Sequence, residues 1–266
     1  MRSALRHRTK EWAEIQPCPW PRVRFVDSHL HLGGAGAPQT LALASGSDIL
    51  LVTCGVDRET SLEGLEHAKT RKGIRAFVGV HPSEAIRAPD LGWLQGALDG
   101  ASGVGEVGLD PKYSPIAAGS AQIRVFHAQL EAAERSGRPV QVHSRDAEGA
   151  CFDALGGFRL KSVLMHWFQD EGKMNRLQEN GYFVSFGPSI VYSKKFQRMA
   201  ARCDRSLVLT ETDYPVAYKP LGGASGPCLV PSVLFKLAEL WKVTFEEAAQ
   251  TVGQNAIRYL GASEKG

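Results

Sequence analysis

The stretch Phe25-Val-Asp-Ser-His-Leu-His-Leu32 is an apolar run of strand length that carries two histidines at its end. Side chains alternate along a strand, so His29 and His31 point to the same face and can bind one cation together. One such pair is weak evidence, because a lone histidine at a strand end is more often a hydrogen-bonded structural residue. The remaining strands decide which interpretation holds.

Eight apolar runs of strand length recur along the chain, and segments with helical patterning separate them. The runs cover residues 23–31, 48–54, 74–80, 102–108, 138–143, 161–166, 181–186 and 207–212. The clearest helix covers 121–135, ends at Gly137 and has an apolar face formed by Ile123, Phe126, Leu130 and Ala133. Alternating strands and helices make a parallel sheet, and eight repeats most simply close into a single (β/α)8 TIM-like barrel with its site at the C-terminal ends of the strands.

Length and composition agree with one large α/β domain. The chain has 266 residues, of which 43% are hydrophobic and 22% charged, and such barrels commonly contain about 250 residues. We expect the barrel to cover 23–266 and an irregular extension to cover 1–22. Closing helices are expected at 233–241 and 245–252, the second beginning with a capping box of Thr244 and Glu247.

The chain carries no sign of membrane insertion or secretion. No apolar run approaches the roughly 20 residues needed to cross a bilayer, and the Arg-rich start lacks an apolar signal core. The five cysteines are far apart and never in a CxxC spacing, which predicts reduced thiols rather than a disulfide framework or a thiolate zinc site. We therefore expect a cytoplasmic protein with no membrane partner and no obligate protein partner.

Six residues lie where the apolar runs stop, so a sheet arranged in chain order brings them together at one edge. They are His29, His31, Glu106, His143, His166 and Asp213. Imidazole and carboxylate groups suit divalent ions such as Mg, Mn and Zn. Two cations about 3.5–4 Å apart can lower the pKa of a shared water and stabilise both the attacking and the leaving oxygen of a phosphodiester. The sequence therefore predicts a two-metal hydrolase.

These motifs resemble those of the TatD family of metal-dependent hydrolases. The matching segments are DSHLHL (27–32), GVHP (79–82), GEVGLD (105–110), HSRDA (143–147), HWF (166–168), SFGPSI (185–190), ETD (211–213) and NAIRY (255–259). The resemblance implies a barrel with two or three divalent cations and, in most members, hydrolysis of DNA, often from a 3′ end. DNA, single-stranded or at a 3′ end, is the substrate that it suggests.

The resemblance also implies a role for each of the six residues. One metal would be held by His29, His31 and Asp213, and the other by His143 and His166. Glu106 would bridge the two metals. Asp213 has a second possible function as the base that accepts a proton from the bridging water, so Asp213 and Glu106 are the predicted catalytic residues. By analogy, Glu211 could hold a third metal.

Residues around the predicted ligands have less specific signals. His81 could donate a hydrogen bond to a substrate phosphate or could cap its strand. Arg145 could contact an anion or pair with a nearby aspartate, and Trp167 is favoured as a stacking surface for a base. Asp27 and Asp110 could orient ligand histidines.

A basic rim could bind the phosphates of a polynucleotide. Its candidates are Lys112, Lys194, Lys195 and Arg198, for which a solvated helix face is an equally good interpretation, while ordinary packing is preferred for Tyr113 and Tyr192. The family pattern is broken at Ser83, at 166–170 and at 223–227, where a common Arg-Asn pair is missing. Three functions stay open: a metal-dependent 3′ exonuclease or endonuclease, a hydrolase of another ester or amide, such as an enzyme that deacylates aminoacyl-tRNA, and a non-catalytic binding protein. The last is weakest, because all six ligands are retained.

Overall fold

Eight strands form one sheet in which neighbours in sequence are also neighbours in space, from β1 to β8, and every pair is parallel. The structure is a computed structural model that describes residues 25–33, 41, 49–223 and 225–261. The extension predicted for 1–22 lies outside the described residues. The strands are β1 (Phe25–Leu30), β2 (Ile49–Cys54), β3 (Ile74–Val78), β4 (Gly103–Gly108), β5 (Val140–His143), β6 (Val163–Met165), β7 (Phe183–Phe186) and β8 (Val208–Thr210).

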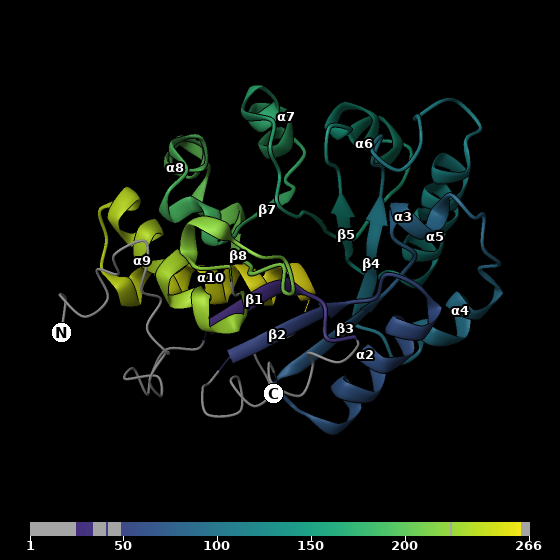
Figure 1. The fold of residues 1–266 in the computed structure, drawn as a ribbon, viewed down its shortest axis with the longest axis horizontal. Helices are drawn as coiled ribbons and strands as arrows, with labels where there is room; N and C mark the ends of the chain where they lie inside the picture. Colours follow the sequence, from purple (N-terminus) through teal and green to yellow (C-terminus); the bar gives the residue numbers. More distant parts are fainter. Residues whose placement is uncertain (1–24, 34–40, 42–48, 224, 262–266) are drawn as a thin grey trace.

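Helices connect the strands and surround the sheet, with α2 and α4 on one side and α8 and α9 on the other (Figure 1). The α-helices are α2 (Arg58–Thr70), α3 (Pro82–Ala85), α4 (Gly92–Leu98), α5 (Ala121–Ser136), α6 (Glu148–Leu155), α7 (Met174–Glu179), α8 (Lys194–Arg202), α9 (Val230–Trp241) and α10 (Phe245–Leu260). Short 3-10 helices are η1 (Glu171–Lys173), η2 (Pro188–Val191), η3 (Arg205–Leu207), η4 (Lys219–Leu221) and η5 (Pro227–Leu229). The predicted (β/α)8 barrel is confirmed.

The predicted helix ends are partly confirmed. Gly137 ends α5 in a left-handed conformation with φ of 61°, and Thr244 forms the predicted capping box with Glu247 at the start of α10. Two predicted bounds were wrong, because α9 already begins at Val230 and α10 continues to Leu260. The second error has a physical reason: the buried face of α10 continues through a polar residue, and its last members are Val252, Asn255, Ala256 and Tyr259.

Four of the five cysteines lie in the part of the chain that the structure describes. Cys54, Cys151, Cys203 and Cys228 are free thiols, whereas Cys18 lies outside the described residues. Within the part of the chain that the structure describes, no helix is both long enough and apolar enough to cross a membrane.

Strand β8 is shorter than predicted, and the residues after it join it to β1. It ends at Thr210 rather than 212, because the chain turns inward towards Asp213, which adopts a left-handed φ of 49°. The backbone N–H of Asp213 donates to the carbonyl of His29 at 2.9 Å, and the N–H of His31 donates to the carbonyl of Tyr214 at 2.8 Å. These bonds bring the first and last strands together at the C-terminal edge.

A buried carboxylate strengthens this closure. Asp27 is fully buried in β1, and its two oxygens accept hydrogen bonds from the backbone N–H of Thr212 at 2.9 Å and from its hydroxyl at 2.6 Å. The prediction that Asp27 orients the ring of a ligand histidine has no direct support: its side chain bonds to Thr212 and to the backbone of His29, and no bond to an imidazole is found among the described residues. Its short side chain reaches the neighbouring strand end rather than an imidazole nitrogen.

Replacing Thr212 with valine should lower the free energy of unfolding by about 1–3 kcal/mol, the usual cost of leaving a buried polar group without its partner. Denaturant unfolding of the metal-free protein, followed by circular dichroism, measures this loss. Thr251→Val is the matched control, because the Thr251 hydroxyl donates to the carbonyl of Glu247 on an exposed helix surface. Equal losses in both variants would contradict the role given to Thr212.

Candidate metal centre

Glu106 lies at the middle of the six residues predicted from the sequence, because each of its oxygens faces two of the histidines. Its Oε2 lies 3.5 Å from Nε2 of His29 and 3.3 Å from Nε2 of His31. Its Oε1 lies 2.8 Å from Nδ1 of His143 and 2.9 Å from Nε2 of His166. One carboxylate therefore connects the two predicted histidine pairs, which is the geometry that a bridging ligand requires.

The glycines of strand β4 allow this approach. Gly108 has a φ of 142°, and a Cβ atom there would lie 2.0 Å from the carbonyl oxygen of His143. Any other residue would push β4 away from β5, where Gly108 pairs with His143. A glycine at this position is needed for Glu106 and His143 to come within contact distance.

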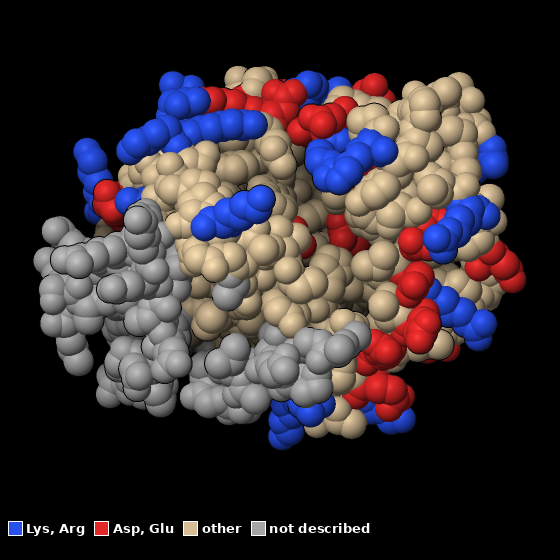
Figure 2. Space-filling view, viewed as in Figure 1, with Lys and Arg blue, Asp and Glu red and all other residues tan. Residues whose placement is uncertain are grey.

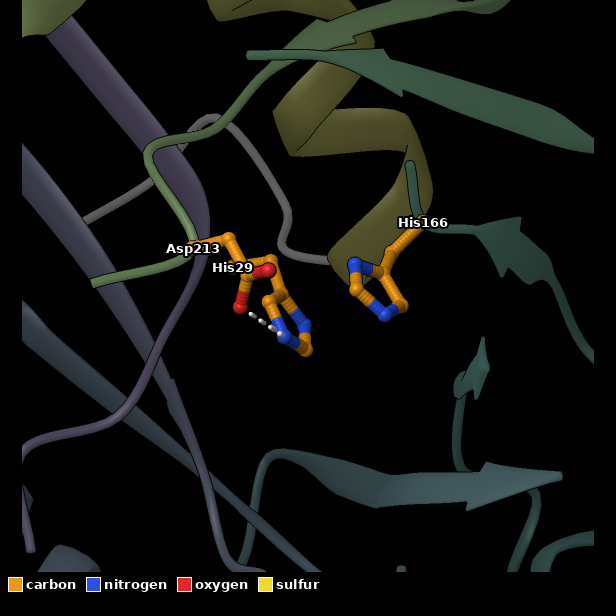
Figure 3. Close-up of side chains that lie close together, drawn as sticks. All are labelled: His29, His166 and Asp213. Atoms are coloured by element: carbon orange, nitrogen blue, oxygen red, sulfur yellow. Dashed lines mark ion pairs between the residues drawn. The ribbon is translucent and has the colours of Figure 1, made fainter. Parts of the chain in front are cut away.

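Asp213 completes the group around β1. Its Oδ1 lies 3.5 Å from Nε2 of His29 and 3.6 Å from Nε2 of His31. Figure 3 shows the Asp213 carboxylate beside His29, with His166 close by. The rings of His29 and His166 stack with centroids 3.8 Å apart, so the two histidine pairs form one compact cluster.

Two of the histidines, His29 and His31, direct Nε2 at the carboxylates. Nδ1 of His31 lies 2.9 Å from the carbonyl of Cys54; a carbonyl only accepts, so this nitrogen carries the proton and the neutral ring has its lone pair on Nε2. Nε2 of His29 is buried without a hydrogen-bond partner among the described residues. An orphaned imidazole nitrogen that faces two carboxylates fits a divalent cation.

Three groups of ligand atoms, each within 4.8 Å of one another, could hold an ion among the described residues. They are His29, His166 and Asp213; His29, His31 and Glu106; and His81, Glu106 and His143. All six predicted ligands belong to at least one group. The donors are imidazoles and carboxylates without thiolate, a set that suits Mg, Mn or Zn.

His143 lies between two carboxylates. Its Nδ1 faces Glu106, and its Nε2 lies 2.8 Å from Oδ2 of Asp110, so Asp110 has the position predicted for a residue that orients a ligand histidine. Asp110 also lies 2.5 Å from Nη2 of Arg145. Of the two possibilities left open for Arg145, the structure thus has the pairing with an aspartate, although one third of its side chain is exposed.

His81 is suited to donate a hydrogen bond rather than to bind a metal. Its Nδ1 accepts a hydrogen bond from the backbone N–H of Ser83 at 3.1 Å, so a neutral ring carries its proton on Nε2. Burial lowers the pKa of His81 to about 4, which keeps the ring neutral at pH 7. Its Nε2 lies 3.6 Å from Oε1 of Glu106 and 3.4 Å from Nδ1 of His143, where it can meet an oxygen of a bound substrate.

Glu211 lies behind His166 rather than among the ligands. Its Oε2 is 3.4 Å from Nδ1 of His166 and accepts a hydrogen bond from the Ser185 hydroxyl at 2.6 Å. Glu211 belongs to none of the three groups found among the described residues. In this position Glu211 is better placed to orient His166 than to hold the third metal inferred by analogy.

Sequence reasoning missed several partners of the ligands. Gln141, Ser185 and the carbonyl of Cys54 each contact one of the ligand histidines or its carboxylate partner. For Gln141 a signal was present, since it is a polar residue between Val140 and Val142, within the part of β5 that precedes His143. Every residue has a backbone carbonyl, so the sequence does not indicate that the one of Cys54 contacts His31.

The basic and aromatic residues considered for contacts with a polynucleotide differ in their surroundings. Trp167 is half-buried with a left-handed φ of 39°, and its ring centroid lies 5.8 Å from that of Tyr218. Arg198 makes a two-pronged ion pair with Glu171 at 2.8 and 3.1 Å, which uses its hydrogen-bonding edge. The remaining candidates Lys112, Tyr113, Tyr192 and Lys194 are exposed, and Lys195 is half-buried.

Cation binding should release protons at neutral pH. Burial lowers the pKa of His31, but hydrogen bonds with Asp213 and Glu106 outweigh it and raise the pKa from 6.5 to about 10. Protonated His31 thus stabilises the metal-free protein fully below pH 6.5, and this contribution is lost as the pH rises through about 10. A metal must displace this proton to bind. The affinity of the protein for a cation should therefore fall as the pH is lowered below about 10.

Calorimetric titration of the metal-free protein with Mn²⁺, in two buffers that differ in ionisation enthalpy, counts the released protons. Equal heats in both buffers would contradict this expectation.

The chain is similar in sequence to a family of known proteins. A family model described as "TatD related DNase" matches residues 26–261. The uncharacterized metal-dependent hydrolase YcfH of Escherichia coli is 30% identical over 88% of this chain and 94% of its own length. Deoxyribonuclease TATDN3 of Homo sapiens is 25% identical over 89% of this chain and 94% of its own length.

Solved structures share the fold. The crystal structure of YjjV, a TatD homologue from Escherichia coli, has a TM-score of 0.80 at 24% identity and covers 91% of this chain and 99% of its own. A TatD family hydrolase from Entamoeba histolytica has a TM-score of 0.70 at 15% identity, with 89% and 98% covered. The chain belongs to the TatD family of metal-dependent hydrolases.

Proposed function

We propose that this protein is a deoxyribonuclease that hydrolyses phosphodiester bonds in DNA with two divalent cations. The observation that carries the proposal is the position of Glu106, with one oxygen towards His29 and His31 and the other towards His143 and His166. The name of the human relative, a deoxyribonuclease, supports DNA as the substrate.

The side chains divide into two sets of metal ligands. His29, His31 and Asp213 would hold one cation, His143 and His166 the other, and Glu106 would contact both. Bound cations of this kind lower the pKa of a water and neutralise the charge of a phosphodiester. The Asp213 carboxylate, whose pKa is held well below its usual range by His29 and His31 despite burial, stays ionised, which both metal binding and proton acceptance require.

Other groups around the cluster can bind and orient an anionic strand. Nε2–H of His81 points into the cluster and can donate to a phosphate oxygen. Arg145 balances the charge of Asp110 and keeps an accessible edge, and Trp167 offers a ring for stacking on a base. Figure 2 shows a hollow near the middle of the face, with acidic side chains visible inside it and lysine and arginine side chains around it.

Purified protein should cleave labelled single-stranded DNA when Mg²⁺ or Mn²⁺ is present. Dialysis against EDTA should abolish cleavage, and returning the ion should restore it, because the cations supply both the nucleophile and the charge stabilisation. Gel electrophoresis of products labelled at either end also shows the direction of attack. Full cleavage in excess EDTA would refute the metal dependence, and hydrolysis of an aminoacyl ester without any cleavage of DNA would favour the alternative substrate class.

Changing Asp213 to asparagine should lower kcat by about 10²–10⁴-fold, the usual contribution of proton transfer, because the amide keeps the size but loses the basicity. Steady-state kinetics and elemental analysis of bound metal should be measured together. Asp204→Asn is the matched control, since Asp204 caps η3 before β8 and takes no part in the cluster. If metal content and turnover both stay near those of the parent protein, Asp213 is not the base.

A further inference from the structure

Gln141 is a buried amide that crosses the interior of the barrel. It belongs to β5, yet both of its strongest contacts are with β1, which is four strands away in the sheet order. Its Oε1 lies 2.6 Å from Nδ1 of His29, and its Nε2 donates to the carbonyl of Ser28 at 2.5 Å. The side chain of Gln141 is fully buried, so water does not replace these contacts.

An irregularity in β1 makes this contact possible. The pairing of β1 with β2 shifts register between Asp27 and Leu30, so Ser28 and His29 lie in the part of the strand that leaves the regular ladder. The carbonyl of Ser28 is then available to an amide from the barrel interior, and Gln141 fills this need. A buried carbonyl without a donor destabilises the folded protein, so this contact also supports the fold.

The contact with Ser28 fixes the direction of the amide. A carbonyl oxygen only accepts hydrogen bonds, so the NH₂ group of Gln141 faces Ser28 and its oxygen faces His29. The thiol of Cys54 donates to the same oxygen at 3.0 Å, which agrees with this direction. The hydrogen bond to His29 therefore needs its proton on Nδ1, which leaves the lone pair of the neutral ring on Nε2.

We infer that Gln141 is a positioning residue that holds His29 in the tautomer and orientation needed to bind a divalent cation. The inference rests on the metal centre proposed above. Nε2 of His29 is buried without a hydrogen-bond partner among the described residues and lies 3.5 Å from both Glu106 and Asp213. Its lone pair faces the carboxylates because the other nitrogen is occupied by Gln141.

Replacing Gln141 with methionine tests this role, because methionine keeps the length of the side chain but can neither accept from His29 nor donate to Ser28. The affinity for Mn²⁺, measured by calorimetric titration, should fall by about 10–100-fold, the usual effect of removing a partner of a metal-binding histidine. In long-range ¹H–¹⁵N spectra of the metal-free protein, the proton of His29 should no longer be confined to Nδ1. Gln141→Glu keeps an acceptor towards His29 and should preserve the Nδ1–H signal.

Asn255→Leu is the matched control. Asn255 is also a buried amide, and its NH₂ group donates to the carbonyls of Arg205 and Val208 at 2.7 Å each, before and at the start of β8 and thus at the opposite end of the barrel. This variant should lose stability while keeping the parent's affinity for Mn²⁺. If Q141M does not fold, Q141L gives the same two readouts.

Two results would overturn the inference. Equal Mn²⁺ affinity and an unchanged His29 spectrum in Q141M would show that the amide only supports the fold, and so would an equal loss of affinity in Asn255→Leu. A parent protein that binds neither Mn²⁺ nor Zn²⁺ would instead overturn the metal centre itself, and this result is distinguishable because it appears before any substitution is made.

Discussion

The buried carboxylate of Glu106 is the group on which the whole site depends. It is only 2% exposed, and a buried charge is costly unless it is paired. Burial alone would raise its pKa, but the surrounding imidazoles outweigh this effect and hold it well below its usual range. Without metal, protons on the histidines supply the balancing charge, and in the proposed metal centre cations would supply it. The cluster is therefore built to exchange protons for cations.

The fold accommodates the buried charge of Glu106 in two ways. Parallel strands place their C-terminal ends at one edge, so residues from β1, β4, β5 and the ends of β6 and β8 meet there. Away from this edge the core is apolar, and it includes Tyr259 packed against Phe77 and Phe183 at centroid distances of 6.0 and 5.4 Å. The apolar packing provides the stability, and the polar edge is free to carry groups that would destabilise a core. This division explains why the six ligands tolerate such close approach.

The order of the strands, their approximate ends and the helix periodicity could be predicted from the sequence, because they depend on neighbours along the chain. The contacts of buried glutamines could not. Gln122 and Gln129 lie seven residues apart on α5, two turns along one face, and each pairs with both backbone groups of a single residue, Asp110 and Val80 respectively. They hold the ends of β4 and β3 in place beside the site. In sequence a helical glutamine looks like a surface residue, since its partner is far away and is only backbone.

The roles of the individual histidines could not be predicted from the sequence for the same reason: they depend on partners far away along the chain. His31 and His81 both follow a strand and both point Nε2 at Glu106. Nδ1 of His31 meets a carbonyl and must donate, whereas Nδ1 of His81 meets a backbone N–H and must accept. In their neutral forms the two side chains therefore present opposite groups to the same carboxylate, a lone pair on Nε2 of His31 and a proton on Nε2 of His81. What separates a metal ligand from a substrate donor is the partner behind the ring, which the strand-end pattern does not encode.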